Sequence, residues 1–418
     1  MEAYAAVLLW AIPGFFILVV IEITFGHFTK KQTYTLMDTL ASLSSGMTNV
    51  IKDVLKLGLI LISYPFLVKN LSLYEMDSTL SIYFIAFIAI DFASYWIHRL
   101  NHRINIFWNQ HIIHHSSEEF NLACALRQSI SNLIGFSALF LIPAAFLGIP
   151  SEVILTLSPL HLFAQFWYHT RHIGKLGLLE YLIVTPSQHR VHHAINPIYI
   201  DKNLAAIFCI WDRIFGTFQE ELDSEPPIYG TLKPVQSWNP IWINFQHFCI
   251  LFRDAWYTKN WSSKIKIWFM PTGWRPKDVI DRFPLVSRKS KPLLRYNPNY
   301  TKNWKFVAIF HFSFLVYLLI FLLSHFSELE TLFKLSYGFL IMGSIFGFTA
   351  LMDLHSWAPL FEQFRGSMAI VFMIIPQNQF LFDTYPFSYV MFIIYFIVTV
   401  CIGFWAKRQA PDRRLALN

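Results

Sequence analysis

The sequence predicts an all-α polytopic membrane protein that carries a histidine-rich metal centre, and three observations support this prediction. The 418 residues are 55% hydrophobic and 14% charged, with a mean hydropathy of +0.43, which lies outside the usual range of soluble globular domains. Apolar runs long enough to cross a bilayer recur along the chain. Nine of the histidines between residues 91 and 203 fall into three short motifs and one single position.

Charge and cysteine content argue against a nucleic-acid partner, a disulfide framework and a thiolate zinc site. Lys and Arg number 33 against 26 Asp and Glu, a formal net charge of +7. In a membrane protein this excess indicates positive loops facing the cytoplasm, so no nucleic-acid partner is predicted. The four cysteines have no Cys-x-x-Cys spacing, which argues against a disulfide framework or a thiolate zinc site.

The N-terminal region contains three predicted membrane crossings. Residues 4–25 are almost all apolar and precede Lys30 and Lys31, so the first helix is expected to end in the cytoplasm. Residues 48–68 are a second predicted crossing, although Lys52, Asp53 and Lys56 crowd its start. Residues 80–97 form the third crossing and deliver His98 to its cytoplasmic end.

The next two apolar runs predict a helical hairpin. Residues 130–147 and 153–167 are separated by Gly148, Pro150 and Ser151, a turn signal. Such a hairpin returns His169 to the membrane face where the second histidine motif lies. From residue 170 to about 303 no run reaches membrane length, which predicts a cytoplasmic segment with aromatic stretches at the interface. Four more crossings are expected at residues 304–323, 335–352, 368–382 and 387–405, giving nine in all.

These features suggest four regions along the chain. Residues 1–79 form N-terminal membrane helices, and residues 80–230 a catalytic domain with the histidine motifs. Residues 231–303 form a cytoplasmic or interfacial segment, and residues 304–418 the C-terminal membrane helices. The basic C-terminus fits a cytoplasmic location.

The three histidine motifs predict a metal centre with more than one ion. His98 and His102 are four residues apart at a helix exit and share a face. The other two motifs are His-x-x-His-His. Packing so many imidazole rings together destabilises a fold unless something binds their nitrogens. One tetrahedral zinc needs four ligands, so nine ligands suggest two ions that take five or six each, and iron suits imidazole. The predicted ligands are His98, His102, His111, His114, His115, His169, His189, His192 and His193.

Three nearby residues carry alternative interpretations. His172 follows His169 by three positions and is either a tenth ligand or a donor outside the ligand set. Asp91 lies seven residues before His98 and either accepts the second ring N–H of a ligand or makes a polar contact within the helix bundle. His161 is expected to be a hydrogen-bond partner within that bundle.

The residues in and around the motifs resemble a known family. His98-Arg99-x-x-His102, His111-x-x-His114-His115 and His189-x-x-His192-His193 resemble the three boxes of the membrane fatty acid hydroxylase and sterol desaturase superfamily. Within it, the flanking words resemble the alkylglycerol monooxygenases, densely from about residue 91 to 218. These words include His-His-Ser-Ser-Glu at 114–118, Thr-Pro-Ser at 185–187 and Ile-Asp-Lys-Asn at 200–203.

The resemblance implies a di-iron centre on the cytosolic side of the membrane, with the nine histidines as ligands. Asp91 and Asn203 then correspond to polar partners of the centre. Glu118, and Glu119 beside it, either bind a pterin, orient a ligand or are solvated. Two departures from the family pattern stand out: Arg103 replaces an expected Glu, and Leu204, Ala205 and Ala206 replace an aromatic residue and paired glycines.

The resemblance also implies an activity: oxidation of the lipid carbon beside an ether oxygen, with molecular oxygen and tetrahydrobiopterin, to give a fatty aldehyde and a glycerol derivative. The alternative is a di-iron hydroxylase or desaturase of a sterol, fatty acid or other lipid, supplied with electrons by a redox partner protein. A metal transporter is disfavoured because the motifs gather at one membrane face. The expected membrane is the endoplasmic reticulum in a eukaryote or the inner membrane in a bacterium, and the sequence makes no prediction of oligomeric state.

Overall fold

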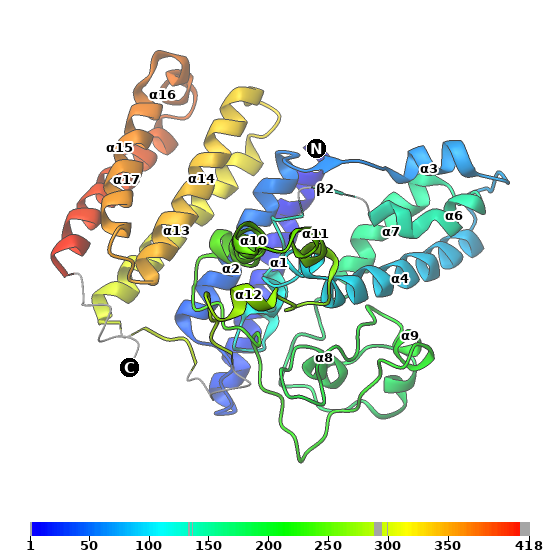
Figure 1. Ribbon diagram of the computed structural model, residues 1–418. Helices are drawn as coiled ribbons and strands as arrows, with labels where there is room; N and C mark the ends of the chain where they lie inside the picture. The colour runs from blue at the N-terminus through cyan, green and yellow to red at the C-terminus, as the bar shows by residue number, and fades with distance from the viewer. Residues whose placement is uncertain (1, 133, 136, 288–294, 299, 410–418) are drawn as a thin grey trace.

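The computed structural model describes residues 2–132, 134–135, 137–287, 295–298 and 300–409, and these are mostly helical (Figure 1). The described part contains one small β element, in which β1 (Leu59–Ile60) pairs in parallel with β2 (Ile134–Gly135). The fold is therefore helical, as predicted, apart from this two-residue ladder.

Residues 1–79 contain one candidate membrane span among their described residues, where two crossings were predicted. Helix α1 spans Glu2–Phe28 and α2 spans Leu36–Val54. The second crossing predicted at 48–68 is wrong, because α2 ends at Val54, the backbone turns at Lys56 with φ 53°, and α3 (Tyr64–Leu71) starts anew. Two charged residues mark this end of α2, where Lys52 Nζ lies 3.2 Å from Asp53 Oδ1. Helix α2 instead packs in the protein interior against α10 (Pro240–Tyr257), α13 (Lys302–Ser324) and α14 (Thr331–Met352).

The predicted hairpin forms, but from short helices. After η3 (Ser137–Leu141) and α6 (Ile142–Phe146), the chain turns into α7 (Ser151–Phe163), which packs on α4 (Leu80–Arg103). Gly148 has φ 78°, and a Cβ there would lie 1.9 Å from the carbonyl oxygen of Tyr74, so the turn requires glycine. The described part of residues 130–147 does not form one crossing, because it contains β2, η3 and the five-residue helix α6 in succession.

The C-terminal helices form a bundle that lies beside the rest of the molecule (Figure 1). Helices α13 (Lys302–Ser324) and α14 (Thr331–Met352) pack together, and α15 (Ala358–Ile374) packs against α17 (Pro386–Gln409). Between α15 and α17 lie η5 (Pro376–Asn378) and α16 (Phe380–Thr384), and the chain bends by 72° at Pro376. Their apolar side chains form the largest core cluster together with those of α2.

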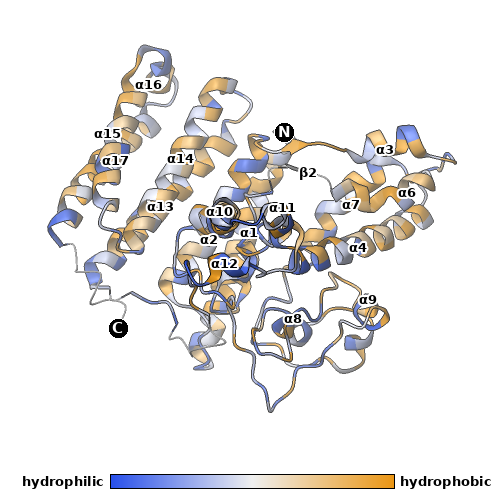
Figure 2. Ribbon diagram, in the orientation of Figure 1, coloured by the Kyte–Doolittle hydropathy of each residue, from blue (hydrophilic) through white to orange (hydrophobic). Residues whose placement is uncertain are grey.

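In the described part of the chain, five helices are long and apolar enough to span a membrane, or six if the bent pair counts as one span. Figure 2 shows apolar residues along these helices. The prediction of nine spans is therefore not confirmed, whereas the prediction of an integral membrane protein is confirmed. The candidate spans are Tyr4–Phe28, Leu80–Arg103, Lys302–Ser324, Thr331–Met352, Pro386–Gln409 and the bent pair Ala358–Ile374 with Pro376–Thr384.

The segment between the two helical regions contains no candidate span among its described residues, as predicted. The part of this segment that contains α8 (Pro186–His192) and α9 (Ile210–Ile214) lies beside α4 in Figure 1. The shorter elements that support the site are α5 (Asn105–Trp108), η1 (His114–Ser116), η2 (Leu122–Leu126), η4 (Gly177–Tyr181), α8 (Pro186–His192), α9 (Ile210–Ile214), α10 (Pro240–Tyr257), α11 (Trp261–Phe269) and α12 (Lys277–Ile280).

Candidate metal centre

The structure gathers all nine of the predicted histidines into two groups. Within each group the candidate ligand atoms lie within 4.8 Å of one another. The five-histidine group consists of His98, His102, His111, His115 and His192, and the four-histidine group consists of His114, His169, His189 and His193. His172 belongs to neither group; its ring packs against Phe25, with 5.1 Å between ring centroids.

Each His-x-x-His-His motif supplies both groups, which the sequence spacing alone does not reveal. His189 on α8 and His193 directly after it are four residues apart and join the four-histidine group, while His192 belongs to the five-histidine group. The second motif divides in the opposite sense, because His111 and His115 join the five-histidine group and His114 joins the other. The two short segments therefore connect the two histidine groups.

The ring nitrogens within each group face one another at short distances. The Nε2 atom of His111 lies 2.9 Å from that of His98 and 3.0 Å from that of His115. In the other group, Nε2 of His189 lies 2.9 Å from that of His169 and 3.0 Å from that of His193. The N–H groups of His98 and His169 lie on Nδ1 and donate to backbone carbonyls, so the Nε2 atoms of these two rings face the other nitrogens with lone pairs.

Two buried nitrogens in the five-histidine group are candidate metal ligands. The Nε2 atoms of His102 and His192 are buried and have no hydrogen-bond partner among the described residues. Leaving a buried polar atom unpaired costs free energy unless a ligand satisfies it. A set made only of imidazole nitrogens suits iron, zinc or copper better than calcium or magnesium, so the residues present fit a transition metal.

Backbone carbonyls fix which nitrogen of several rings carries the proton. His98 Nδ1 donates to the carbonyl oxygen of Leu204 at 2.7 Å, and His192 Nδ1 donates to that of Lys202 at 3.0 Å. His169 Nδ1 donates to the carbonyl oxygen of Gln165 at 3.0 Å. Protonation at Nδ1 leaves Nε2 with its lone pair directed into the group, as a metal ligand requires.

Asn203 lies between the two carbonyls that orient His98 and His192. Its backbone is left-handed, with φ 51°, a conformation that Asn tolerates. Its Nδ2 donates to the carbonyl oxygens of Gln188 at 3.0 Å and Gln219 at 2.7 Å, and its Oδ1 accepts from the Gln219 amide at 2.8 Å. Asn203 thus ties α8 to the 217–219 segment and holds the turn from which the two carbonyls project.

Asp91 is fully buried, and its four hydrogen bonds involve no histidine of either group. It accepts from His161 Nε2 at 2.8 Å and from Trp211 Nε1 at 2.9 Å. It also accepts from the amides of Ile207 at 2.9 Å and Phe208 at 3.0 Å. The carboxylate therefore fastens the 207–211 segment to the middle of α4, and His161 is a bundle hydrogen-bond partner, as expected.

Asp201 is a residue of the site that the sequence reasoning did not single out. Its Oδ1 lies 3.6 Å from His102 Nδ1, and its Oδ2 lies 3.3 Å from Arg103 Nε. Partial burial opposes ionisation, but the His102 ring and the Arg103 guanidinium outweigh it and lower the pKa of the Asp201 carboxyl. The only sequence signal was its place in the Ile-Asp-Lys-Asn word beside Asn203.

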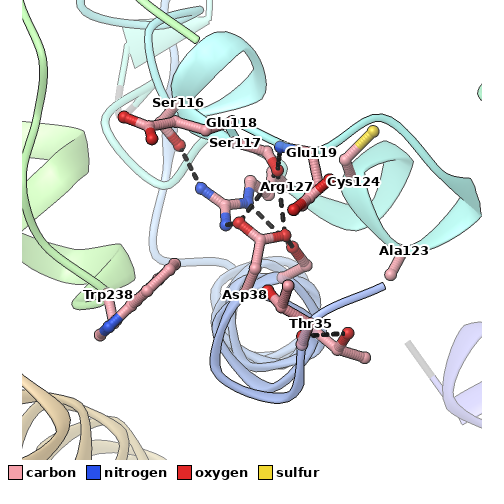
Figure 3. Close-up of polar contacts among 12 residues, drawn as sticks. Thr35, Asp38, Ser116, Ser117, Glu118, Glu119, Ala123, Cys124, Arg127 and Trp238 are labelled. Carbon is pink, nitrogen blue, oxygen red and sulfur yellow. Dashed lines mark hydrogen bonds and ion pairs between the residues drawn. The ribbon is translucent and has the colours of Figure 1, made fainter. Parts of the chain in front are cut away.

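A buried ion pair anchors the loop that follows the second histidine motif (Figure 3). Arg127 is 1% exposed, and its Nη2 lies 2.6 Å from Asp38 Oδ1 on α2. The same guanidinium donates from Nη1 to Ser116 Oγ at 2.6 Å and from Nε to Ser42 Oγ at 2.9 Å. Because Ser116 follows His115 directly, this network connects an N-terminal helix to a candidate ligand.

Glu118 and Glu119 lie beside this network and face segment 295–296. Glu118 Oε2 accepts from the Tyr296 amide at 2.8 Å, and Glu119 Oε1 lies 2.7 Å from Arg295 Nη1. Burial raises the pKa of the Glu119 carboxyl, although the Arg295 charge opposes that shift. Glu118 lines a small recess whose other walls include Asp38, Ser116, Arg127, Trp238 and Tyr296.

The electrostatics keep the rings neutral. Burial, followed by the proximity of other histidines, lowers the pKa of the His189 and His193 rings well below the ordinary value. Burial also lowers the pKa of His169 to about 4, against two backbone acceptors that favour its protonation. Neutral imidazoles at pH 7 are the form that binds a metal.

Membrane-length helices and two histidine groups able to bind metal ions are features of a membrane metalloenzyme, and comparisons with known proteins agree that the chain is a membrane enzyme. A sequence model of the fatty acid hydroxylase family matches residues 83–217. The chain is 32% identical to alkylglycerol monooxygenase of Xenopus tropicalis, over 97% of this chain and 90% of that protein. It is 33% identical to alkylglycerol monooxygenase of Homo sapiens, over 96% and 88% of the two chains.

A third relative, alkylglycerol monooxygenase of Danio rerio, is 37% identical over 68% of this chain and 64% of that protein. The chain belongs to the alkylglycerol monooxygenase family. No solved structure matches it significantly.

Proposed function

We propose that this protein is a membrane di-iron monooxygenase that cleaves the ether bond of alkylglycerol lipids. The observation that supports it most directly is the division of nine histidines into groups of five and four within one site. The family relationship, with relatives named alkylglycerol monooxygenase at 32% and 33% identity over nearly the whole chain, supports the same function. The proposed iron ligands are the nine histidines of these two groups.

In the proposed reaction, the O-alkyl carbon beside the ether oxygen is hydroxylated. One atom of molecular oxygen enters the C–H bond, the other leaves as water, and tetrahydrobiopterin supplies two electrons. The resulting hemiacetal breaks its C–O bond to give a fatty aldehyde and a glycerol derivative. The iron ions would supply the oxygen chemistry, and the protein would place the lipid and exclude water.

The surrounding residues are proposed to act on the ligands and not on the lipid. Asn203 positions the carbonyls of Lys202 and Leu204, which orient His192 and His98. Asp91 fastens the 207–211 segment that follows this turn. Both are positioning residues in this proposal, since neither side chain bonds a grouped histidine among its recorded contacts.

Glu118 is proposed to contribute to the pterin site. A pterin ring presents an N–H and an amino group side by side, which a carboxylate binds, and it stacks on aromatic rings. The recess lined by Ser116 also contains the Glu118 carboxylate and the Trp238 and Tyr296 rings, whose centroids lie 5.1 Å apart. Changing Glu118 to Gln is expected to raise the KM for tetrahydrobiopterin while leaving the KM for the lipid unchanged.

The proposed site faces the cytoplasm, in the endoplasmic reticulum of a eukaryote or the inner membrane of a bacterium. Lys30 and Lys31 directly after α1, and Lys407 and Arg408 at the end of α17, support this orientation.

The decisive experiment gives the purified, iron-loaded protein an alkylglycerol, oxygen and tetrahydrobiopterin, and measures fatty aldehyde. Aldehyde that requires both oxygen and pterin supports the proposal. Its absence from protein with two bound irons per chain would contradict the proposed reaction. A parallel reaction replaces the pterin with a reductase and a small electron-transfer protein; turnover only there would favour the alternative of a hydroxylase or desaturase supplied by a redox partner.

A further inference from the structure

We infer that Asp201, held by Arg103, is a positioning residue that supports His102 and makes the two metal positions chemically different. The inference rests on the proposed metal site and concerns residues outside the ligand set. Asp201 Oδ1 lies 3.6 Å from His102 Nδ1, on the side of the ring away from the group, while the buried His102 Nε2 has no partner among the described residues. A carboxylate on the remote nitrogen of a ligand histidine fixes its tautomer and strengthens it as a donor.

The turn around Asp201 makes the geometry specific to the five-histidine group. Residues 201–204 place three acceptors beside that group: the Asp201 carboxylate near His102, the Lys202 carbonyl on His192 and the Leu204 carbonyl on His98. One four-residue turn therefore faces the remote nitrogens of three of the five histidines. Left-handed backbone at both Asp201, φ 58°, and Asn203, φ 51°, gives the turn its shape.

The four-histidine group has a different surrounding. The remote nitrogen of His169 meets only backbone carbonyls, and His189 Nδ1 is buried without a hydrogen-bond partner among the described residues. In the part of the chain that the structure describes, Asp201 is the acidic residue within ion-pair distance of a grouped histidine. A carboxylate thus supports one metal position and neutral acceptors support the other.

Arg103 completes the arrangement from the end of α4. Its side chain is 54% exposed, and its Nε lies 3.3 Å from Asp201 Oδ2, leaving Oδ1 free to face His102. Arg103 and His102 are consecutive residues, so the same helix end presents the ligand and fixes the carboxylate that supports it. Arg103 therefore acts through Asp201 and has no direct role at the metal.

The test measures iron and not only turnover. The full-length protein is purified in detergent, loaded with ⁵⁷Fe, and examined by metal analysis and Mössbauer spectroscopy. Wild type is expected to bind two irons that give two distinct signals. Asp201→Asn keeps the side-chain shape and suits the left-handed backbone, yet loses the charge. We expect it to weaken one iron site by about 10–100-fold and to leave the signal of the other iron unchanged.

Asp223→Asn is the matched control, because Asp223 is an exposed residue of the same region and its substitution changes net charge equally. Arg103→Gln is expected to weaken the same iron site by a smaller factor. The double variant Asp201→Asn with Arg103→Gln should match Asp201→Asn alone, since both changes act through one carboxylate. Arg103→Lys should weaken that iron site less than Arg103→Gln does, because lysine keeps the positive charge.

Three outcomes would overturn the inference. The first is an Asp201→Asn protein with wild-type iron affinity and spectra. The second is an equal loss of both irons together with a lower melting temperature, which indicates a purely structural role. The third is additive effects on iron affinity in the double variant. If Asp201→Asn does not fold, Arg103→Gln decides, because undisturbed iron binding there excludes the proposed arrangement. Wild-type protein that does not hold two irons would contradict the proposed function. This result is distinguishable from a failure of the inference about Asp201, which concerns only the variants.

Discussion

Asp38 on α2 and Arg127 after the second histidine motif form a buried ion pair, with 2.6 Å between Oδ1 and Nη2 (Figure 3). The Asp38 and Arg127 side chains are 3% and 2% exposed, so water does not solvate either charge if its partner is removed. The pair joins residues 89 positions apart. The catalytic region is therefore assembled on the N-terminal helices as well as on its own segment.

Replacing Asp38 with Asn should leave the Arg127 guanidinium buried without a counter-charge. Breaking such a pair from one side typically costs about 3–5 kcal/mol. We expect a lower unfolding temperature together with weaker iron retention, because Ser116, which Arg127 binds, follows His115. Glu220→Gln is the control, since Glu220 pairs with Lys175 at the exposed surface, and it should leave both measurements unchanged. An Asp38→Asn protein with wild-type stability would exclude this anchoring role.

Asp91→Asn should disturb the site without touching a ligand. Four N–H groups donate to the Asp91 carboxylate, whereas an amide places two hydrogens of its own in that space. We expect loss of stability and reduced iron content. The matched control is Asp77→Asn, at an exposed position before α4. Unchanged iron content in a destabilised Asp91→Asn protein would show that the 207–211 segment does not influence His98.

At Asn203, the order of two variants separates backbone from side-chain effects. Asn203→Gly accepts the φ of 51° but loses the bonds to Gln188 and Gln219. Asn203→Ala loses the same bonds and adds a left-handed Cβ penalty of roughly 1–2 kcal/mol. We therefore expect Ala to be less stable than Gly, and both to bind iron less tightly than wild type. Chemical unfolding and metal titration measure these effects, and the reverse order would contradict the role assigned to the backbone.

His247 should contribute a measurable acid sensitivity. Burial, followed by the nearby Lys233 charge, lowers the pKa of His247 to about 4, and its Nε2 donates to the Asn105 carbonyl at 3.0 Å. In the unfolded chain a histidine titrates near pH 6.5, so the unfolded state binds the extra proton between these values. The stabilisation is therefore full above about pH 6.5 and is lost as the pH falls toward about 4.

The matched variant is His247→Gln, which can still donate to Asn105 but does not titrate. Wild type should lose about 3 kcal/mol more stability than this variant across that pH range, as measured by unfolding at several pH values. Parallel pH profiles would show that His247 is not the source of the sensitivity.

Much of the fold was predictable where one physical property dominates. Apolar runs such as residues 304–323 and 335–352 became helices α13 and α14, because a long uninterrupted apolar stretch satisfies its backbone only as a helix. The prediction was wrong at 48–68, where hydropathy averaged over charged Lys52 and Asp53 concealed the end of α2. Length and turn signals located the α6–α7 hairpin, but not how short its helices are.

The nine histidines themselves were identifiable from the sequence, since motif spacing and residue chemistry are local properties. Their division into five and four was not, because it depends on which way His114 and His192 face once three segments have packed together. The sequence left two alternatives for Asp91, and it did not reveal the contact of Asp201. A carboxylate's partner is set by distance in space, and only the tertiary structure brings Asp201 beside His102 and Arg103.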